Sequence, residues 1–154
     1  MTNVNDVAAY ITQHFDSPIS TMKLQKLTYF SQGWALAVLG KPLFADDFEA
    51  WANGPVVYSL FDNHRGQFTV DAWKWGNASE LNHSERRVID AVLRNYGALS
   101  GAQLSEMTHR KGTPWFAARA RAGAGPRQRA QEPVSKEDMK KFFGDEIGRA
   151  RRSS

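Results

Sequence analysis

The segment from Lys23 to Pro42 reads KLQKLTYFSQGWALAVLGKP and is too apolar for an ordinary surface helix. Among its large side chains it nevertheless keeps Gln25, Gln32 and Gly33. Polar residues interrupt its longest apolar run, which is shorter than the roughly 18–20 residues that cross a bilayer. We therefore expect a central core helix surrounded by other helices, not a membrane anchor. In that position Gly33 permits close approach of a neighbouring helix, and the two glutamines need hydrogen-bond partners.

The composition of the 154 residues fits one domain that is large enough to fold without covalent crosslinks. The chain has no cysteine, which excludes disulfides and Cys-ligated metal sites and fits a reducing cytoplasm. Its first residues lack the basic segment and apolar run of a signal peptide. Residues 110–154 hold 12 Lys or Arg against 5 Asp or Glu, a balance of +7, whereas residues 1–109 hold 8 against 11, a balance of −3. The basic end is either a contact for an anion or nucleic acid or a solvated tail.

Apolar spacing and helix-end signals predict a mainly α-helical, compact single domain. Apolar residues recur on one helical face in residues 4–15 and 88–96, and again in 139–147, which we predict to be a C-terminal amphipathic helix. Glycine ends are predicted at Gly40 and Gly97. Helix starts are predicted where a good N-cap residue precedes such a segment, at Ser20, Asn82, Ser100, Thr113 and Ser135.

The middle of the chain, about residues 44–75, is predicted to hold a small two-stranded β element. The segments FEAW (48–51) and QFTVDAWKW (67–75) have the composition of short strands, and we predict that they pair with each other. Gly54-Pro55 between them predicts the start of a short helix, because proline at the first helical position loses no hydrogen bond.

Motifs for catalysis are absent from the sequence. There is no phosphate-binding glycine loop, no zinc-protease motif and no nucleophile elbow, and no two histidines lie four residues apart, so we expect no cofactor and no metal. His109 with Arg110 and Lys111, or His64 with Arg65, has the residue types of a small hydrolase that uses acid–base chemistry. We prefer the interpretation of these pairs as polar loop residues.

Residues 82–109 have the length and turn of a helix–turn–helix unit. The second helix of this unit, GAQLSEMTH, contains neither Lys nor Arg, and phosphate attraction supplies most of the affinity of DNA-binding proteins. A packed helical hairpin is therefore the preferred interpretation. A nucleic-acid-binding transcriptional regulator, using this hairpin and the basic tail, remains the alternative function.

Three ordered segments carry a family resemblance: KLQKLTYFSQGWALAVLGKPLF, DFEAWANGPVV and YGALSGAQLSEMTHRKGTPW. Together they resemble the Panacea antitoxin domain, a family that includes SocA-like antitoxins and phage-associated GepA-like proteins. The resemblance covers about residues 4–120. We accordingly take residues 1–122 as the Panacea-like domain and residues 123–154 as a basic linker and a helix packed on it or extending from it. One departure is Ala52-Asn53, which stands where the family commonly has a bulky or aromatic residue.

The resemblance implies a non-enzymatic antitoxin of a bacterial or phage toxin–antitoxin system. Such a protein neutralises a cognate protein toxin by direct binding or by delivering it to a protease, and its own promoter DNA is a second expected partner. Aromatic and arginine side chains often anchor protein interfaces. The predicted partner-binding residues are Trp51, Tyr58, Trp73, Trp75, Arg119 and Arg121. The residues that match the family segments are expected to shape the scaffold, and these are Lys23, Gln25, Gln32, Gly33, Trp34, Glu49, Gly54, Pro55, His109 and Trp115.

Overall fold

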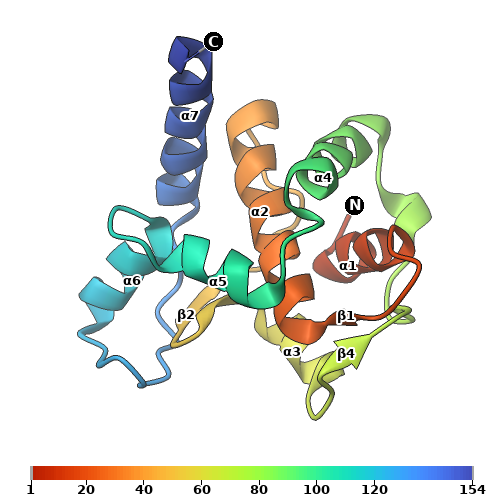
Figure 1. Ribbon diagram of the computed structural model, residues 1–154, viewed down its shortest axis with the longest axis horizontal. Coiled ribbons are helices and arrows are strands. Elements are labelled where there is room, and N and C mark those ends of the chain that lie inside the picture. Colours follow the sequence, from red (N-terminus) through yellow and green to blue (C-terminus); the bar gives the residue numbers. More distant parts are fainter. Residues whose placement is uncertain (1, 154) are drawn as a thin grey trace.

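The computed structural model describes residues 2–153, in which α-helices predominate over two short antiparallel sheets (Figure 1). The mainly helical class predicted from the sequence is confirmed. The helices are α1 (Val4–Gln13), α2 (Thr21–Leu39), α3 (Tyr58–His64), α4 (His83–Tyr96), α5 (Gly101–His109), α6 (Pro114–Ala122) and α7 (Lys136–Ser153), with a 3-10 turn η1 (Ala78–Glu80). The strands are β1 (Ile19–Ser20), β2 (Glu49–Trp51), β3 (Gly54–Val56) and β4 (Thr69–Val70).

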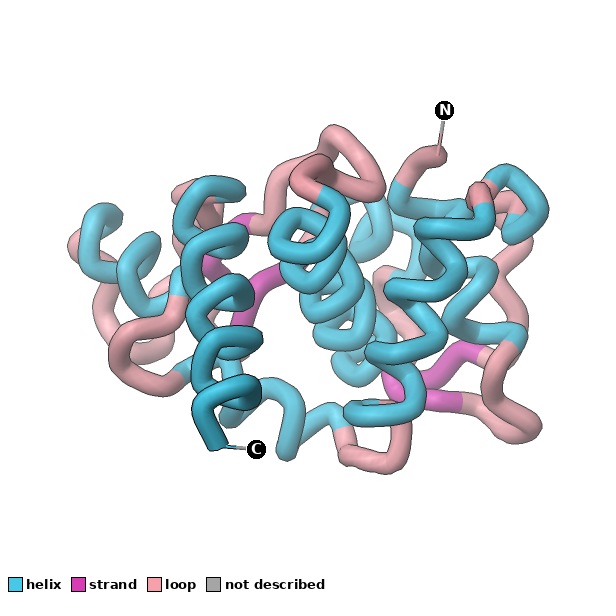
Figure 2. The backbone as a smooth tube through the Cα atoms, turned by 90° about the horizontal axis from the view of Figure 1, so that it is seen from above, coloured by secondary structure: helices cyan, strands magenta, loops and turns pink. Residues whose placement is uncertain are grey.

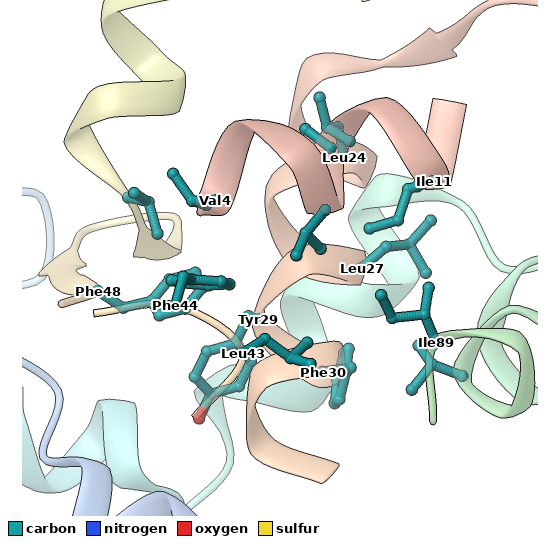
Figure 3. Packing of buried hydrophobic residues seen from close by; sticks show 14 of the residues in the cluster. Val4, Ile11, Leu24, Leu27, Tyr29, Phe30, Leu43, Phe44, Phe48 and Ile89 are labelled. Carbon is teal, nitrogen blue, oxygen red and sulfur yellow. The ribbon is translucent and has the colours of Figure 1, made fainter. Parts of the chain in front are cut away.

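Helix α2 is the centre of the molecule. It contacts α1, α4, α5 and α7, which lie around it in both views of the backbone (Figures 1 and 2). Every residue from Leu24 to Gly33 is buried, and Leu24, Leu27, Tyr29 and Phe30 pack into a core with side chains of α1, α4 and the segment before β2 (Figure 3). The predicted core helix is thus confirmed. Among residues 2–153, no helix combines the length and the apolar character needed to span a bilayer.

The predicted helix starts agree with the structure because each is set by a local hydrogen bond. Asn82 with Glu85 and Ser100 with Gln103 form complete capping boxes. The remaining predicted caps each accept a bond from the first turn of the helix that follows, and they are Ser20, Thr113 and Ser135.

The β pairing differs from the prediction. Strand β2 pairs with β3 in a tight hairpin, with Ala50 opposite Pro55, and β4 pairs instead with β1. The prediction of a helix start at Gly54-Pro55 was also wrong. Gly54 has a φ of 119°, which only glycine adopts readily, and it closes the hairpin, so the helix starts later, at Tyr58.

Helix α7 packs along α2 at the position of the small residue in the core helix. A Cβ atom at Gly33 would overlap the ring of Phe143, which is buried and also contacts Tyr29, Phe30 and Trp34. The close helix approach expected at Gly33 is therefore present. The last part of the basic C-terminal segment, Lys136–Ser153, is helix α7, which packs against α2.

Candidate partner-binding surface

Two buried glutamines of α2 fix the segment that leads into and out of the β2–β3 hairpin. Gln32 donates from Nε2 to the Phe44 carbonyl (2.9 Å) and accepts from the Leu43 N–H (2.7 Å). Gln25 makes the same pair of bonds with Val57, at 3.2 and 3.0 Å. Each side-chain amide thus donates to one backbone carbonyl and accepts from one backbone N–H, as a neighbouring β-strand would. These bonds satisfy backbone groups that burial would otherwise leave unpaired.

The hairpin carbonyl oxygens are held by side chains from the helices packed behind them. Those of Ala50 and Trp51 accept from Arg119 (2.9 Å) and Trp115 (2.7 Å) of α6. The next two, of Ala52 and Asn53, lie within 3.0 Å of His109 Nε2 and within 2.6 Å of Ser105 Oγ, both on α5. Consecutive hairpin residues are therefore fixed from one side. We call this side of the hairpin the inner face.

Lys26 completes the inner face from α2. Its ammonium nitrogen donates to the Pro55 carbonyl at 3.2 Å, and its side chain lies against Gly54. No carboxylate among residues 2–153 forms an ion pair with it. Burial without a counter-charge lowers the pKa of Lys26 to about 7. Burial is also the main reason that the pKa of nearby His64 is lowered, with the charge of Lys26 as a smaller cause.

Three aromatic rings, one from β2 and two from α3, form a cluster beside the hairpin. The ring centroid of Trp51 lies 4.8 Å from that of Phe61 and 6.4 Å from that of Tyr58, and Tyr58 and Phe61 are 5.8 Å apart. Tyr58 is 41% exposed, and the other two rings are half-buried. Edge-to-face packing of this kind fixes ring orientation while leaving the outward surface open.

Two arginines lie over these rings. The guanidinium of Arg129 is 3.8 Å from the Trp51 ring centroid, and that of Arg65 is 5.1 Å from the Phe61 centroid. Arg65 also donates to the Tyr58 hydroxyl at 2.6 Å. We define Trp51, Tyr58, Phe61, Arg65 and Arg129 as the aromatic surface. It combines cationic and aromatic groups, the residue types most frequent at the centres of protein interfaces.

The structure brings some of the predicted partner-binding residues together and separates others. Trp51 and Tyr58 share the aromatic surface. Ring contacts continue from Phe61 through buried His64 and Trp73 to Trp75, which is 39% exposed. Trp73 itself is buried, and its indole donates to Asn5 Oδ1.

The two predicted arginines of α6 have different environments. Arg119 is buried in the inner face, where it donates to the carbonyls of Ala50, Gly125 and Gln128. Arg121 is exposed and lies 3.5 Å from Glu132 and 3.4 Å from Asp138, away from the aromatic surface. A direct partner contact by Arg119 would therefore require its side chain to leave these three carbonyls.

Three further residues that were predicted to shape the scaffold are Lys23, Trp34 and Glu49. Lys23 donates to the Gly97 carbonyl at 2.6 Å, which joins α2 to the end of α4, and burial lowers its pKa. Trp34 donates to the Tyr96 hydroxyl, and Glu49 accepts from the Trp51 indole. These three hydrogen bonds are internal to the fold.

Sequence reasoning missed three members of the aromatic surface. Phe61 lies three residues after Tyr58 on α3, and Arg65, the residue that ends the helix, lies four residues after Phe61, a spacing that was available in the sequence. Arg129 has no such local signal. It reaches Trp51 because the segment from 132 to 134 adds to the open edge of β2, through the bonds of Ala50 N–H to Glu132 O and of Val134 N–H to Phe48 O.

The histidines considered for acid–base chemistry both make internal contacts. His64 is buried, and its Nε2 lies 3.1 Å from Gln25 Nε2. His109 has Nδ1 against the Ser105 carbonyl and Nε2 against that of Ala52. Helix α5 is the second helix of the helix–turn–helix alternative, and its residues Leu104, Ser105 and Thr108 are buried in the fold.

Comparison with known proteins identifies the family of the chain. The family model described as "Antitoxin SocA-like, Panacea domain" matches residues 24–116, from the core helix through the hairpin to α6. The chain belongs to the Panacea antitoxin family. A curated Panacea relative, "Antitoxin SocA" from Caulobacter vibrioides (strain NA1000 / CB15N), is 36% identical over 112 residues. The match covers 65% of this chain and 60% of that relative, so the chain spans less than two thirds of the relative's length. No solved structure matches the chain.

Proposed function

We propose that this chain is a non-enzymatic, cytoplasmic antitoxin that neutralises a cognate protein toxin by direct binding. Its membership of the Panacea antitoxin family carries the proposal. The aromatic surface is the docking site, because it gathers a tryptophan of the fixed hairpin, a tyrosine of α3 and two arginines into one exposed cluster. A standard protein interface buries about 800 Å² on each partner and depends on a few such anchors. The two arginines favour an acidic patch on the toxin.

The test is rescue of growth. The protein encoded beside this chain is expressed alone and together with the antitoxin, in its original form or as the Tyr58→Ala/Arg129→Glu variant. We expect the original chain to restore growth. The variant should bind the toxin about 30-fold or more weakly, because loss of an interface anchor costs about 2 kcal/mol or more. Phe68→Ala, which removes a 90% exposed ring elsewhere, is the matched control and should rescue fully.

Two further readouts distinguish the alternatives. A toxin level that stays constant on rescue supports direct inhibition, whereas a fall in its level supports delivery to a protease. A neighbouring protein that is harmless, or that remains toxic while the antitoxin is folded and abundant, would contradict the proposed function. Full rescue by the Tyr58→Ala/Arg129→Glu variant would move the docking site elsewhere. Promoter binding that weakens steeply with salt would support the regulator alternative.

A further inference from the structure

A groove of about 760 Å³ lies between the C-terminal half of α2 and the length of α4. Its floor is apolar and includes Trp34 and Val38 from α2 and Val88 and Ala91 from α4. Val38 is 58% exposed, which is unusual for an aliphatic side chain on the central helix of a protein. We call this feature the α2–α4 groove. It shares no lining residue with the aromatic surface.

The charged side chains that line the groove are both arginines. Arg87 and Arg94 are exposed and lie seven residues apart on α4, which places them about 10 Å from each other along the helix axis on one face. Neither makes an ion pair or a side-chain hydrogen bond with any residue in the described range 2–153. The groove lining includes no carboxylate. The apolar floor is therefore bordered by two cations that are free to pair with a ligand.

We propose that the α2–α4 groove binds an acidic amphipathic helix of a second protein. An amphipathic helix buries its apolar side in such a groove through residues spaced three, four and seven apart. Acidic residues two turns apart on the bound helix would face Arg87 and Arg94, since seven residues on each helix span the same distance. The floor supplies the hydrophobic contact, and the two arginines select for acidic sequences and fix the orientation of the helix.

The chain's own C-terminal helix carries two acidic residues at this spacing, Asp138 and Asp145, but it is already engaged elsewhere. Helix α7 packs on α2 through Phe143, along a different flank from α4 (Figures 1 and 2), and Asp138 forms an ion pair with Arg121. Its last turns also carry Arg149 and Arg151, which the arginines of the groove would repel. We therefore assign the groove to an acidic helix from another protein.

The proposal does not depend on the identity of the toxin, and its test uses no toxin. The probe is a displayed library of amphipathic peptides of about 16 residues, long enough to form a helix when bound. Acidic, basic and neutral residues are all allowed on the polar side, and the full chain is the target. We expect selection to enrich peptides with Asp or Glu two turns apart. The dominant peptide should shift the indole N–H signal of Trp34 in an NMR titration.

Charge reversal supplies the decisive comparison. The Arg87→Glu/Arg94→Glu variant should bind the dominant peptide at least about tenfold more weakly, and a Lys-substituted peptide should recover that loss. The matched control is Arg65→Glu/Arg129→Glu, which reverses two arginines on the aromatic surface and should leave peptide binding unchanged. Val38→Glu, a change at an exposed floor position, should also abolish binding while circular dichroism confirms that the variant is folded.

Several results would overturn the proposal. These are no enrichment of any peptide, enrichment of basic or uncharged peptides, and binding that survives both Arg87→Glu/Arg94→Glu and Val38→Glu. Binding that is lost only in the Arg65→Glu/Arg129→Glu control would place peptide recognition on the aromatic surface. None of these results bears on toxin rescue, so failure of this proposal and failure of the proposed function can be told apart.

Discussion

The inner face of the β2–β3 hairpin and the aromatic surface beside it are held by different kinds of interaction. On the inner face, polar side chains of α2, α5 and α6 bind main-chain groups, as Gln25 does with Val57 and Arg119 with Ala50. On the aromatic surface, side chains contact other side chains, as Arg129 does with Trp51. Bonds to the main chain depend on the path of the hairpin and not on which side chains it carries. Side chains on the aromatic surface can therefore change without altering that path.

This difference assigns separate roles to the two faces. The inner face fixes where the hairpin lies, so we expect substitutions there to reduce stability first and binding only as a consequence. The aromatic surface contributes little to the fold, so substitutions there should reduce binding at nearly constant stability. The most direct test is to remove one inner-face residue and to measure both the free energy of unfolding and the affinity for the toxin.

The largest effect on stability is expected for Arg119→Ala. The substitution leaves the carbonyls of Ala50, Gly125 and Gln128 without their charged donor, so the free energy of unfolding should fall by about 3 kcal/mol. Arg121→Ala, two residues later on the same helix, removes only half-exposed ion pairs and should change it by less than about 0.5 kcal/mol. Urea unfolding of both variants measures the contrast. Equal stability of the two variants, with toxin binding lost only in Arg119→Ala, would instead make Arg119 a contact residue.

An intermediate effect is expected from the buried charge of Lys26. Its pKa is about 7 in the folded chain and has the ordinary value of 10.5 when exposed, so between these values the unfolded state holds a proton that the folded state lacks. Stability should therefore rise with pH across this window, by up to about 1.4 kcal/mol per pH unit. Between pH 7.5 and 9 we expect a gain of about 2 kcal/mol relative to Lys26→Met.

The measurement is urea unfolding of both proteins at several pH values up to 9. His64 titrates below this range, because burial lowers its pKa, and Tyr10 titrates above it, because burial and the bond to Asp90 raise its pKa to about 12. Neither group then contributes to the slope. Parallel pH curves for the two proteins would show that Lys26 stays charged in the folded state.

The smallest effect on stability is expected on the aromatic surface. Arg129→Ala removes cation–π contacts at an exposed site, which contribute about 0.5–1 kcal/mol, so the free energy of unfolding should fall by no more than that. Toxin binding measured by calorimetry should weaken by about tenfold, since the guanidinium borders the proposed docking site. A loss of stability as large as that of Arg119→Ala would show that both faces support the fold.

Local signals made the helices predictable and long-range pairing made the sheets unpredictable. The cap at Ser100 depends on a side chain three residues away, so sequence spacing reveals it. The pairing of Ile19 with Val70 depends on how α2 and α3 place the two segments, and neither strand exceeds two residues. Gly54-Pro55 has the local chemistry of a helix start, but the positive φ of Gly54 is part of a tight hairpin.

The candidate site, like the fold, could be predicted from the sequence only in part. The need of the buried glutamines for partners followed from the apolar character of their helix, but the identity of those partners, such as Phe44 and Val57, required the fold. Trp51 and Tyr58 were predicted as anchors from residue type alone. Arg129 comes from a glycine- and proline-containing segment that resembles a linker, and only the pairing of residues 132–134 with β2 places it over Trp51.

The contact between Gly33 and Phe143 joins a part of the chain that matches the family model to a part that lies outside the match. Gly33 lies within the segment that matches the Panacea model, and Phe143 lies beyond its end at residue 116. In related chains the two positions should covary. A relative with glycine at this point of the core helix should carry an aromatic residue in a later helix, and a relative with a larger residue there should lack that helix or dock it elsewhere. A single position in the matched domain can therefore report which type of C-terminal extension a family member carries.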